Sequence, residues 1–114
     1  MSLAILSNET QAPLTINAGQ NSPAIYAPFA EKVAFAVVAS AASSPDGTTV
    51  GIQGSIDGVN YATLTGLVTV TGNGTFFVEL GERLCSYIWY RLVYARTSGS
   101  YVSTATALTK GQPL

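Results

Sequence analysis

The chain has 114 residues, of which 47% are hydrophobic and only 10% are charged, with five basic residues, six acidic residues and no histidine. This length suits one domain with its own hydrophobic core, and a net charge of −1 excludes the basic footprint that nucleic-acid binding needs. An average soluble domain is about 25% charged. So little charge suits a protein covered by neighbouring subunits, because each unpaired charge is costly to desolvate.

The first residues, 1–12, are predicted to form an extended arm. They contain no Lys or Arg and their apolar run is short, so we expect no secretory signal. No apolar run in the chain approaches the ~20 residues of a membrane span. The apolar side chains of Leu3, Ile5 and Leu6 gain nothing from exposure to water. We therefore expect the arm to clamp a neighbouring subunit or shell, with a disordered terminus as the alternative.

Residues 13–109 are predicted to form one β-sandwich domain, followed by a flexible tail at 110–114. Apolar and polar residues alternate in short runs, and clusters of Gly, Pro, Asn, Asp and Ser separate these runs roughly every ten residues. The predicted strands are, in chain order, residues 14–18, 32–39, 48–56, 61–65, 67–71, 75–80, 87–96 and 101–108. This spacing predicts an all-β, antiparallel β-sandwich of about eight strands. A jelly roll and an immunoglobulin-like sandwich both fit, and we take the jelly-roll type as the expected fold.

The second predicted strand leads into an Ala-rich run, residues 34–42, that would also favour a helix. Val33, Val37 and Val38 favour a strand instead, because β-branched residues pack well on a pleated surface. The core is expected to draw on one face of each strand: Val33, Phe35, Val37, Val50, Ile52, Ile56, Phe76, Val78, Leu80, Trp89, Leu92 and Val93.

Asp57 and Gly58 form the strongest hairpin signal in the chain. Gly58 is expected to take a positive φ while Asp57 accepts backbone hydrogen bonds in the turn. Residues 57–60 also suggest part of a calcium loop, but two candidate side chains fall short of the six or more oxygen ligands that calcium takes. We therefore predict a structural turn, with no metal site and no cofactor.

No catalytic residue is predicted, and the chain is expected not to be an enzyme. Without histidine there is no imidazole for general-base chemistry or a catalytic triad, and no Cys/His cluster for zinc. Cys85 is the only cysteine, so we expect a small buried side chain rather than a nucleophile. Glu79 and Glu82 flank a predicted turn, where solvated charges usually lie.

Aromatic residues concentrate on the last two predicted strands. One face of the first of these strands carries Tyr87, Trp89, Arg91, Val93 and Ala95, and the other carries Ile88, Tyr90, Leu92, Tyr94 and Arg96. Both faces are mostly apolar, whereas one face of a sandwich sheet normally meets water. We therefore expect a second cover from another subunit or from the arm. The predicted interface residues are Leu3, Ile5, Leu6, Tyr87, Trp89, Tyr90, Tyr94 and Tyr101.

A carbohydrate-binding or receptor-binding module, on a phage tail or a secreted protein, is the alternative, because aromatic platforms bind sugars. It requires several of five aromatic residues to lie exposed on one face: Tyr61, Trp89, Tyr90, Tyr94 and Tyr101.

Three segments within residues 48–108 carry a family resemblance: Ser55-Ile56-Asp57-Gly58-Val59-Asn60-Tyr61, Gly72-Asn73-Gly74-Thr75-Phe76 and Tyr87-Ile88-Trp89-Tyr90-Arg91-Leu92-Val93. They resemble small β-sandwich virion proteins of tailed bacteriophages, including head decoration (cement) proteins. The resemblance implies a structural role in the virion and no catalytic residues, and it does not choose between head and tail. We expect a protein on the phage head surface, present in the host cytoplasm during assembly. Its expected partners are the major capsid protein and further copies of this chain, in a trimer at a capsid three-fold position.

Overall fold

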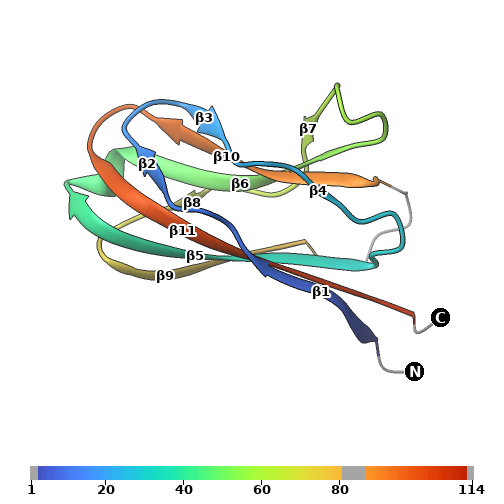
Figure 1. Cartoon of the computed structure of the whole chain (residues 1–114). Coiled ribbons are helices and arrows are strands. Elements are labelled where there is room, and N and C mark those ends of the chain that lie inside the picture. The colour runs from blue at the N-terminus through green and yellow to red at the C-terminus, as the bar shows by residue number, and fades with distance from the viewer. Residues whose placement is uncertain (1–2, 81–86, 113–114) are drawn as a thin grey trace.

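The structure is a computed structural model that describes residues 3–80 and 87–112. The predictions for Cys85 and Glu82 lie outside these residues. Two antiparallel β-sheets pack face to face, and both chain ends lie at the same end of the sandwich (Figure 1). A short 3₁₀ turn at Pro45–Gly47 is the one helical element in the described part of the chain.

The strands are β1 (Ala4–Thr10), β2 (Leu14–Ile16), β3 (Gln20–Asn21), β4 (Ile25–Tyr26), β5 (Lys32–Ser43), β6 (Thr48–Ser55), β7 (Ala62–Thr63), β8 (Val68–Thr69), β9 (Gly74–Leu80), β10 (Trp89–Arg96) and β11 (Ser100–Gly111). One sheet, here called sheet A, has the order β1-β11-β5-β9, and β2 also pairs with β11. The other, sheet B, has the order β3-β10-β6-β7, with β4 on β10 and β8 on β6.

Three pairs of short strands act as single interrupted edge strands. β1 and β2 pair with successive stretches of β11, β3 and β4 do the same on β10, and β7 and β8 on β6. When each of these pairs is counted as one strand, the described part of the chain has eight strands. Numbered along the chain, they have the order 1-8-3-6 in sheet A and 2-7-4-5 in sheet B. This is the strand order of a jelly roll, so the predicted fold class is confirmed and the immunoglobulin-like alternative is excluded.

The core lies between the sheets and largely follows the predicted pattern. Seven predicted core residues are buried: Val33, Phe35, Val37, Val50, Ile52, Val78 and Leu92. Phe76 and Leu80 are partly buried and pack against them. The β5 segment is one continuous strand through its Ala-rich part. Alternate side chains of β5 face the core, and its backbone pairs with β9 on one side and with β11 on the other.

Three core predictions are wrong. Ile56 follows the end of β6 and is 68% exposed. Trp89 and Val93 lie on the outward face of β10 and are only half-buried, because Tyr90, Leu92 and Tyr94 take the inward positions.

Near both chain ends, the described residues belong largely to strands, where the sequence predicted an arm and a tail. Most of the predicted arm is β1, which pairs with β11 of the same chain from Ala4↔Gly111 to Thr10↔Thr106. The predicted tail is shorter than expected, because β11 continues through Lys110 to Gly111. A clamp on a neighbouring subunit stays a prediction for Ile5 and Leu6, whose side chains are exposed.

Candidate docking surface at one end of the sandwich

The centre of the candidate site is Trp89, on the outward face of β10. It pairs in register with Tyr26 of β4 on one side and with Ser55 of β6 on the other. The ring centroids of Tyr26 and Trp89 are 4.8 Å apart, with 50° between the ring planes. Trp89 is half-buried, whereas Tyr26 is 61% exposed.

The turn after β6 is held closed by Asp57. Its Oδ1 accepts hydrogen bonds from the backbone N–H groups of Asn60 and Val59, both at 2.8 Å, and from Ser55 Oγ at 2.9 Å. Its Oδ2 accepts one from Asn60 Nδ2 at 2.8 Å. These hydrogen bonds, above all the backbone one from Asn60, hold the pKa of the Asp57 carboxyl well below its usual range.

The predicted role of this turn is therefore confirmed. Asp57 accepts backbone hydrogen bonds, and Gly58 has a φ of +77°. Within residues 3–80 and 87–112, no group of three or more His, Cys, Asp or Glu side chains is placed to hold a metal ion.

The turn also packs against Trp89. A Cβ atom on Gly58 would lie only 3.0 Å from Trp89 Nε1, so the backbone of the turn lies directly on the indole. The next residue, Val59, is 78% exposed, so the turn that lies against Trp89 also carries an exposed apolar side chain.

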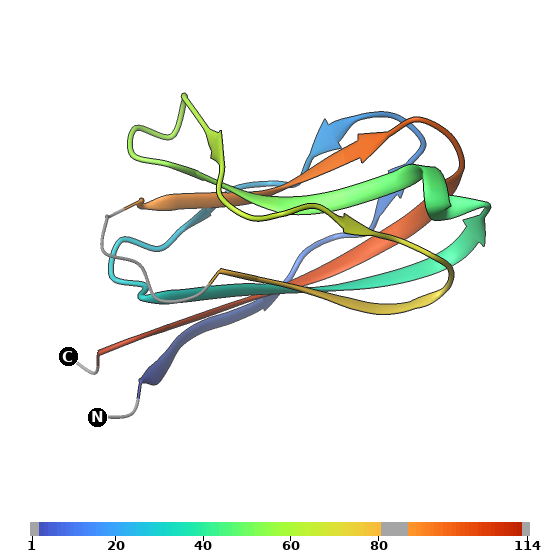
Figure 2. The same cartoon turned by 180° about the vertical axis from the view of Figure 1, so that it is seen from behind.

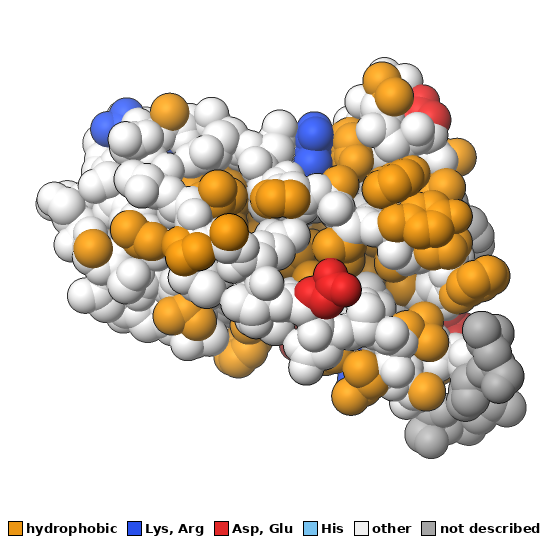
Figure 3. Space-filling view, in the orientation of Figure 1, with side chains coloured by type: hydrophobic (Ala, Val, Ile, Leu, Met, Phe, Trp, Pro, Cys, Tyr) orange, Lys and Arg blue, Asp and Glu red, His pale blue; other side chains and the backbone are white. Residues whose placement is uncertain are grey.

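Tyr26 also borders a second group of apolar residues. A hollow of about 150 Å³ is lined by Leu6, Tyr26 and Phe29, together with Ser7, Ala27, Pro28 and Thr109. Phe29 is 66% exposed and Leu6 is also exposed. We call the set Leu6, Tyr26, Phe29, Val59 and Trp89 the apolar end. Figure 3 shows hydrophobic side chains gathered where β4 meets the start of β10.

Local sequence explains why Tyr26 and Phe29 stand out from the fold. The Ala27 N–H still bonds to Ile88 O at 2.8 Å, beside β10, whereas the Glu31 N–H bonds to Lys110 O of sheet A at 2.8 Å. The chain thus crosses between the sheets over only a few residues. Pro28 lies inside this crossing, and since proline has no N–H it cannot continue the strand. Phe29 is left on the outer surface of the crossing.

Three predicted interface residues are in the wrong place for an interface. Tyr90, Tyr94 and Tyr101 face the other sheet and are at most 1% exposed. The Tyr94 hydroxyl lies 2.8 Å from Ser103 Oγ, and its ring meets that of Tyr101 edge-on at 6.5 Å. Burial raises the pKa of both of these tyrosines. These side chains build the core of the chain itself and are closed to any partner.

The remaining predicted residues lie nearer the surface. Leu3 and Tyr87 are half-buried, and Tyr87 packs against the core. Farther along β10, the Arg91 guanidinium lies 3.7 Å from the centroid of the Tyr61 ring, and Arg91 Nε donates to Gln53 Oε1 at 2.9 Å. Part of the outward face of β10 is thus covered by this chain's own side chains.

Tyr26, Phe29 and Val59 were not predicted as site residues. The signal that could have identified Tyr26 and Phe29 is their position next to Ala27 and Pro28, in a segment too irregular to belong to a regular core strand.

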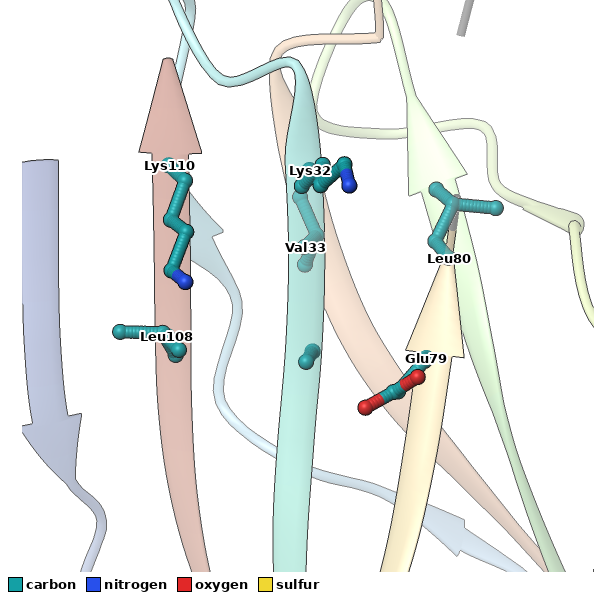
Figure 4. A pocket seen from close by; sticks show the side chains of 7 residues that line it. Lys32, Val33, Glu79, Leu80, Leu108 and Lys110 are labelled. Carbon is teal, nitrogen blue, oxygen red and sulfur yellow. The ribbon is translucent and has the colours of Figure 1, made fainter. Parts of the chain in front are cut away.

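A larger cavity of about 390 Å³ lies on sheet A. It is lined by Lys32, Val33, Ala34, Glu79, Leu80, Leu108 and Lys110 (Figure 4). Lys32 and Lys110 are cross-strand neighbours, and Glu79 pairs in register with Ala34. The cavity therefore mixes both signs of charge over an apolar floor.

No helix in the described part of the chain has the length and hydropathy to cross a membrane. Comparison with protein-family models, curated proteins and solved structures gives no match.

Proposed function

We propose that the protein is a non-enzymatic structural subunit of a phage particle, a head decoration protein that docks on the major capsid protein. The observation that carries the docking proposal is the apolar end. Its five side chains come from four separate parts of the chain. Tyr26 and Trp89 are in ring contact, Leu6 and Phe29 line a hollow together with Tyr26, and Val59 follows Gly58, which lies against Trp89.

The chemistry of this surface suits a protein partner. Burying a side chain such as Phe29 contributes about 1.5–3 kcal/mol relative to leaving it in water. Tyr, Trp and Phe are the side chains enriched at the centres of protein interfaces, where charged residues are depleted. The nearby Asp57 carboxylate already accepts four hydrogen bonds from its own turn, which lowers the cost of covering it.

The virion context rests on the resemblance of the turn and strand segments to small β-sandwich virion proteins of tailed bacteriophages, and the jelly roll is compatible with it. Jelly rolls occur in viral capsid proteins and also in lectins, so the fold alone does not choose between these functions. The proposed location is the outer surface of the phage head.

The test is co-sedimentation with shells assembled from the major capsid protein of the same genome. The wild type is expected to bind, and Tyr26→Ser and Phe29→Ser are each expected to weaken binding by at least about tenfold, corresponding to about 1.4 kcal/mol. Leu67→Ser is the matched control, because Leu67 is an exposed apolar residue outside the apolar end. A wild type that does not bind shells would contradict the head function. Equal binding by all variants would contradict the docking surface.

The same aromatic pair gives the carbohydrate-binding alternative one specific basis. Tyr26 and Trp89 form a tilted, partly exposed pair on which a sugar could stack, although three of the five aromatic residues first expected in such a platform are buried. Reproducible glycan-array hits that are lost in Tyr26→Ser and Trp89→Ala variants that remain folded would favour this alternative.

A further inference from the structure

The edges of the two sheets differ in how they are protected. In sheet A, residues 11–13 interrupt the edge formed by β1 and β2, and the register also shifts between Ile5 and Ser7. In sheet B, residues 22–24, with Pro23, interrupt one edge, and residues 64–67 interrupt the other. Short strands, prolines and bulges are the common means by which proteins keep edge strands from pairing with other chains.

The fourth edge, β9, has none of these features. Its seven residues pair with β5 without a register shift, from Gly74↔Ala39 to Leu80↔Val33. It contains no Pro, Lys or Arg, and its one charge is Glu79. No other strand in the described part of the chain pairs with its free side, and it forms the border of sheet A when the molecule is seen from behind (Figure 2). At its midpoint, Phe77 is 66% exposed.

We infer that β9 pairs antiparallel with β9 of a second copy of this chain, across a two-fold axis at Phe77. A free strand edge presents unpaired N–H and C=O groups that another strand satisfies. A second copy fits because the sequence of β9 is compatible with itself in this register. Centring the pair on Phe77 is the alignment in which all seven residues find a partner, from Gly74 opposite Leu80 onward.

The side chains agree with this register on both faces. On the outward face, Phe77 meets its own counterpart, and Glu79 lies opposite Thr75, which carries no charge. On the inward face, Phe76 lies opposite Val78, so the apolar layer continues from one subunit into the next. A pair centred on Glu79 would instead place two carboxylates directly opposite each other, which is destabilising.

This contact has a defined consequence for assembly. A two-fold contact uses the same patch on both subunits and closes at a dimer. Sheet A of each copy would join into one continuous sheet, with β9 at its centre. The contact does not use the apolar end, so shell docking and dimer formation can fail independently.

The first test is sedimentation of charge variants at high micromolar concentration. The wild type is expected to be a dimer. Phe77→Lys and Phe77→Glu are each expected to be folded monomers, because Phe77 is exposed and each variant places like charges opposite each other. Mixing the two variants is expected to restore a dimer through Lys–Glu pairing. Leu67→Lys, which also adds a charge at an exposed apolar position, is expected to remain a dimer.

A monomeric wild type would overturn the inference. A wild-type trimer would also overturn it and would support the three-fold assembly expected from the sequence. A Phe77→Lys protein that stays dimeric would show that the contact lies elsewhere.

The second test fixes the register by disulfide cross-linking in a Cys85→Ser background. Directly opposed residues in an antiparallel pair have Cα atoms about 4.5–5.5 Å apart, within the range that a disulfide spans. Phe77→Cys is therefore expected to cross-link with itself. Thr75→Cys is expected to cross-link only when mixed with Glu79→Cys. Self-cross-linking of Thr75→Cys at the rate of Phe77→Cys would contradict the register.

Discussion

Gly58 lies directly against Trp89. A Cβ atom on Gly58 would stand 3.0 Å from the indole Nε1, and the φ of Gly58 is +77°. A side chain at this position is therefore opposed both by the backbone conformation and by the space available. This contact joins the Asp57 turn to the apolar end and fixes where Val59 is presented.

Gly58→Ala is expected to lower the free energy of unfolding by about 1 kcal/mol or more, because alanine disfavours a positive φ. It is also expected to change the fluorescence of Trp89, the only tryptophan. Urea unfolding followed by this fluorescence measures both effects. Gly66→Ala is the control, since a Cβ there meets nothing within 4 Å and its φ is not in the positive range. Equal losses in the two variants would contradict the close contact.

The Asp57 turn is expected to make stability depend on pH. Because hydrogen bonds lower the folded pKa of Asp57, its contribution is present above the unfolded value of about 4 and is lost as the pH falls further. Asp57→Asn removes this titration, so the stability difference between wild type and variant is expected to shrink in acid. Asn60→Ala removes one of the four hydrogen bonds and is expected to weaken the pH dependence in part. Unfolding curves at neutral and acidic pH test this, and a difference that does not vary with pH would contradict it.

Two buried tyrosines are expected to respond differently to loss of the hydroxyl group. Tyr94→Phe leaves Ser103 Oγ without its 2.8 Å partner and should cost about 1–2 kcal/mol of unfolding free energy. The Tyr101 hydroxyl has no hydrogen-bond partner in the described residues, so Tyr101→Phe should be neutral or stabilising. Denaturant unfolding of both variants gives the comparison. A larger loss for Tyr101→Phe than for Tyr94→Phe would reverse the expected order.

Most of the longer strands and the fold class could be predicted from the sequence because alternation and turn clusters are local patterns. Examples are β5, predicted over residues 32–39 and observed over Lys32–Ser43, and the Asp57-Gly58 turn. Which face of β10 points inward could not be predicted, because both faces are mostly apolar. Packing against the other sheet decides this, and it buries Tyr90 and Tyr94 while leaving Trp89 outward. Two predicted interface residues of β10 are therefore core residues, and Tyr101 of β11 is a third.

The apolar end was missed for a related reason. Tyr26 belongs to a two-residue strand, which is too short to show any periodicity, and Phe29 lies in the crossing between the sheets. Leu6 and Val59 reach the same surface from distant parts of the sequence. Their proximity depends on long-range pairing of β1 with β11 and of β4 and β6 with β10.

Site-specific photo-cross-linking on decorated shells can detect contact between the apolar end and the major capsid protein. A photoreactive phenylalanine analogue at position 29 is expected to form adducts with the major capsid protein, because Phe29 projects from the apolar end. The same analogue at position 67, an exposed apolar site away from that surface, is expected to form none. Adducts from position 67 with none from position 29, on shells that bind the protein, would contradict docking through the apolar end.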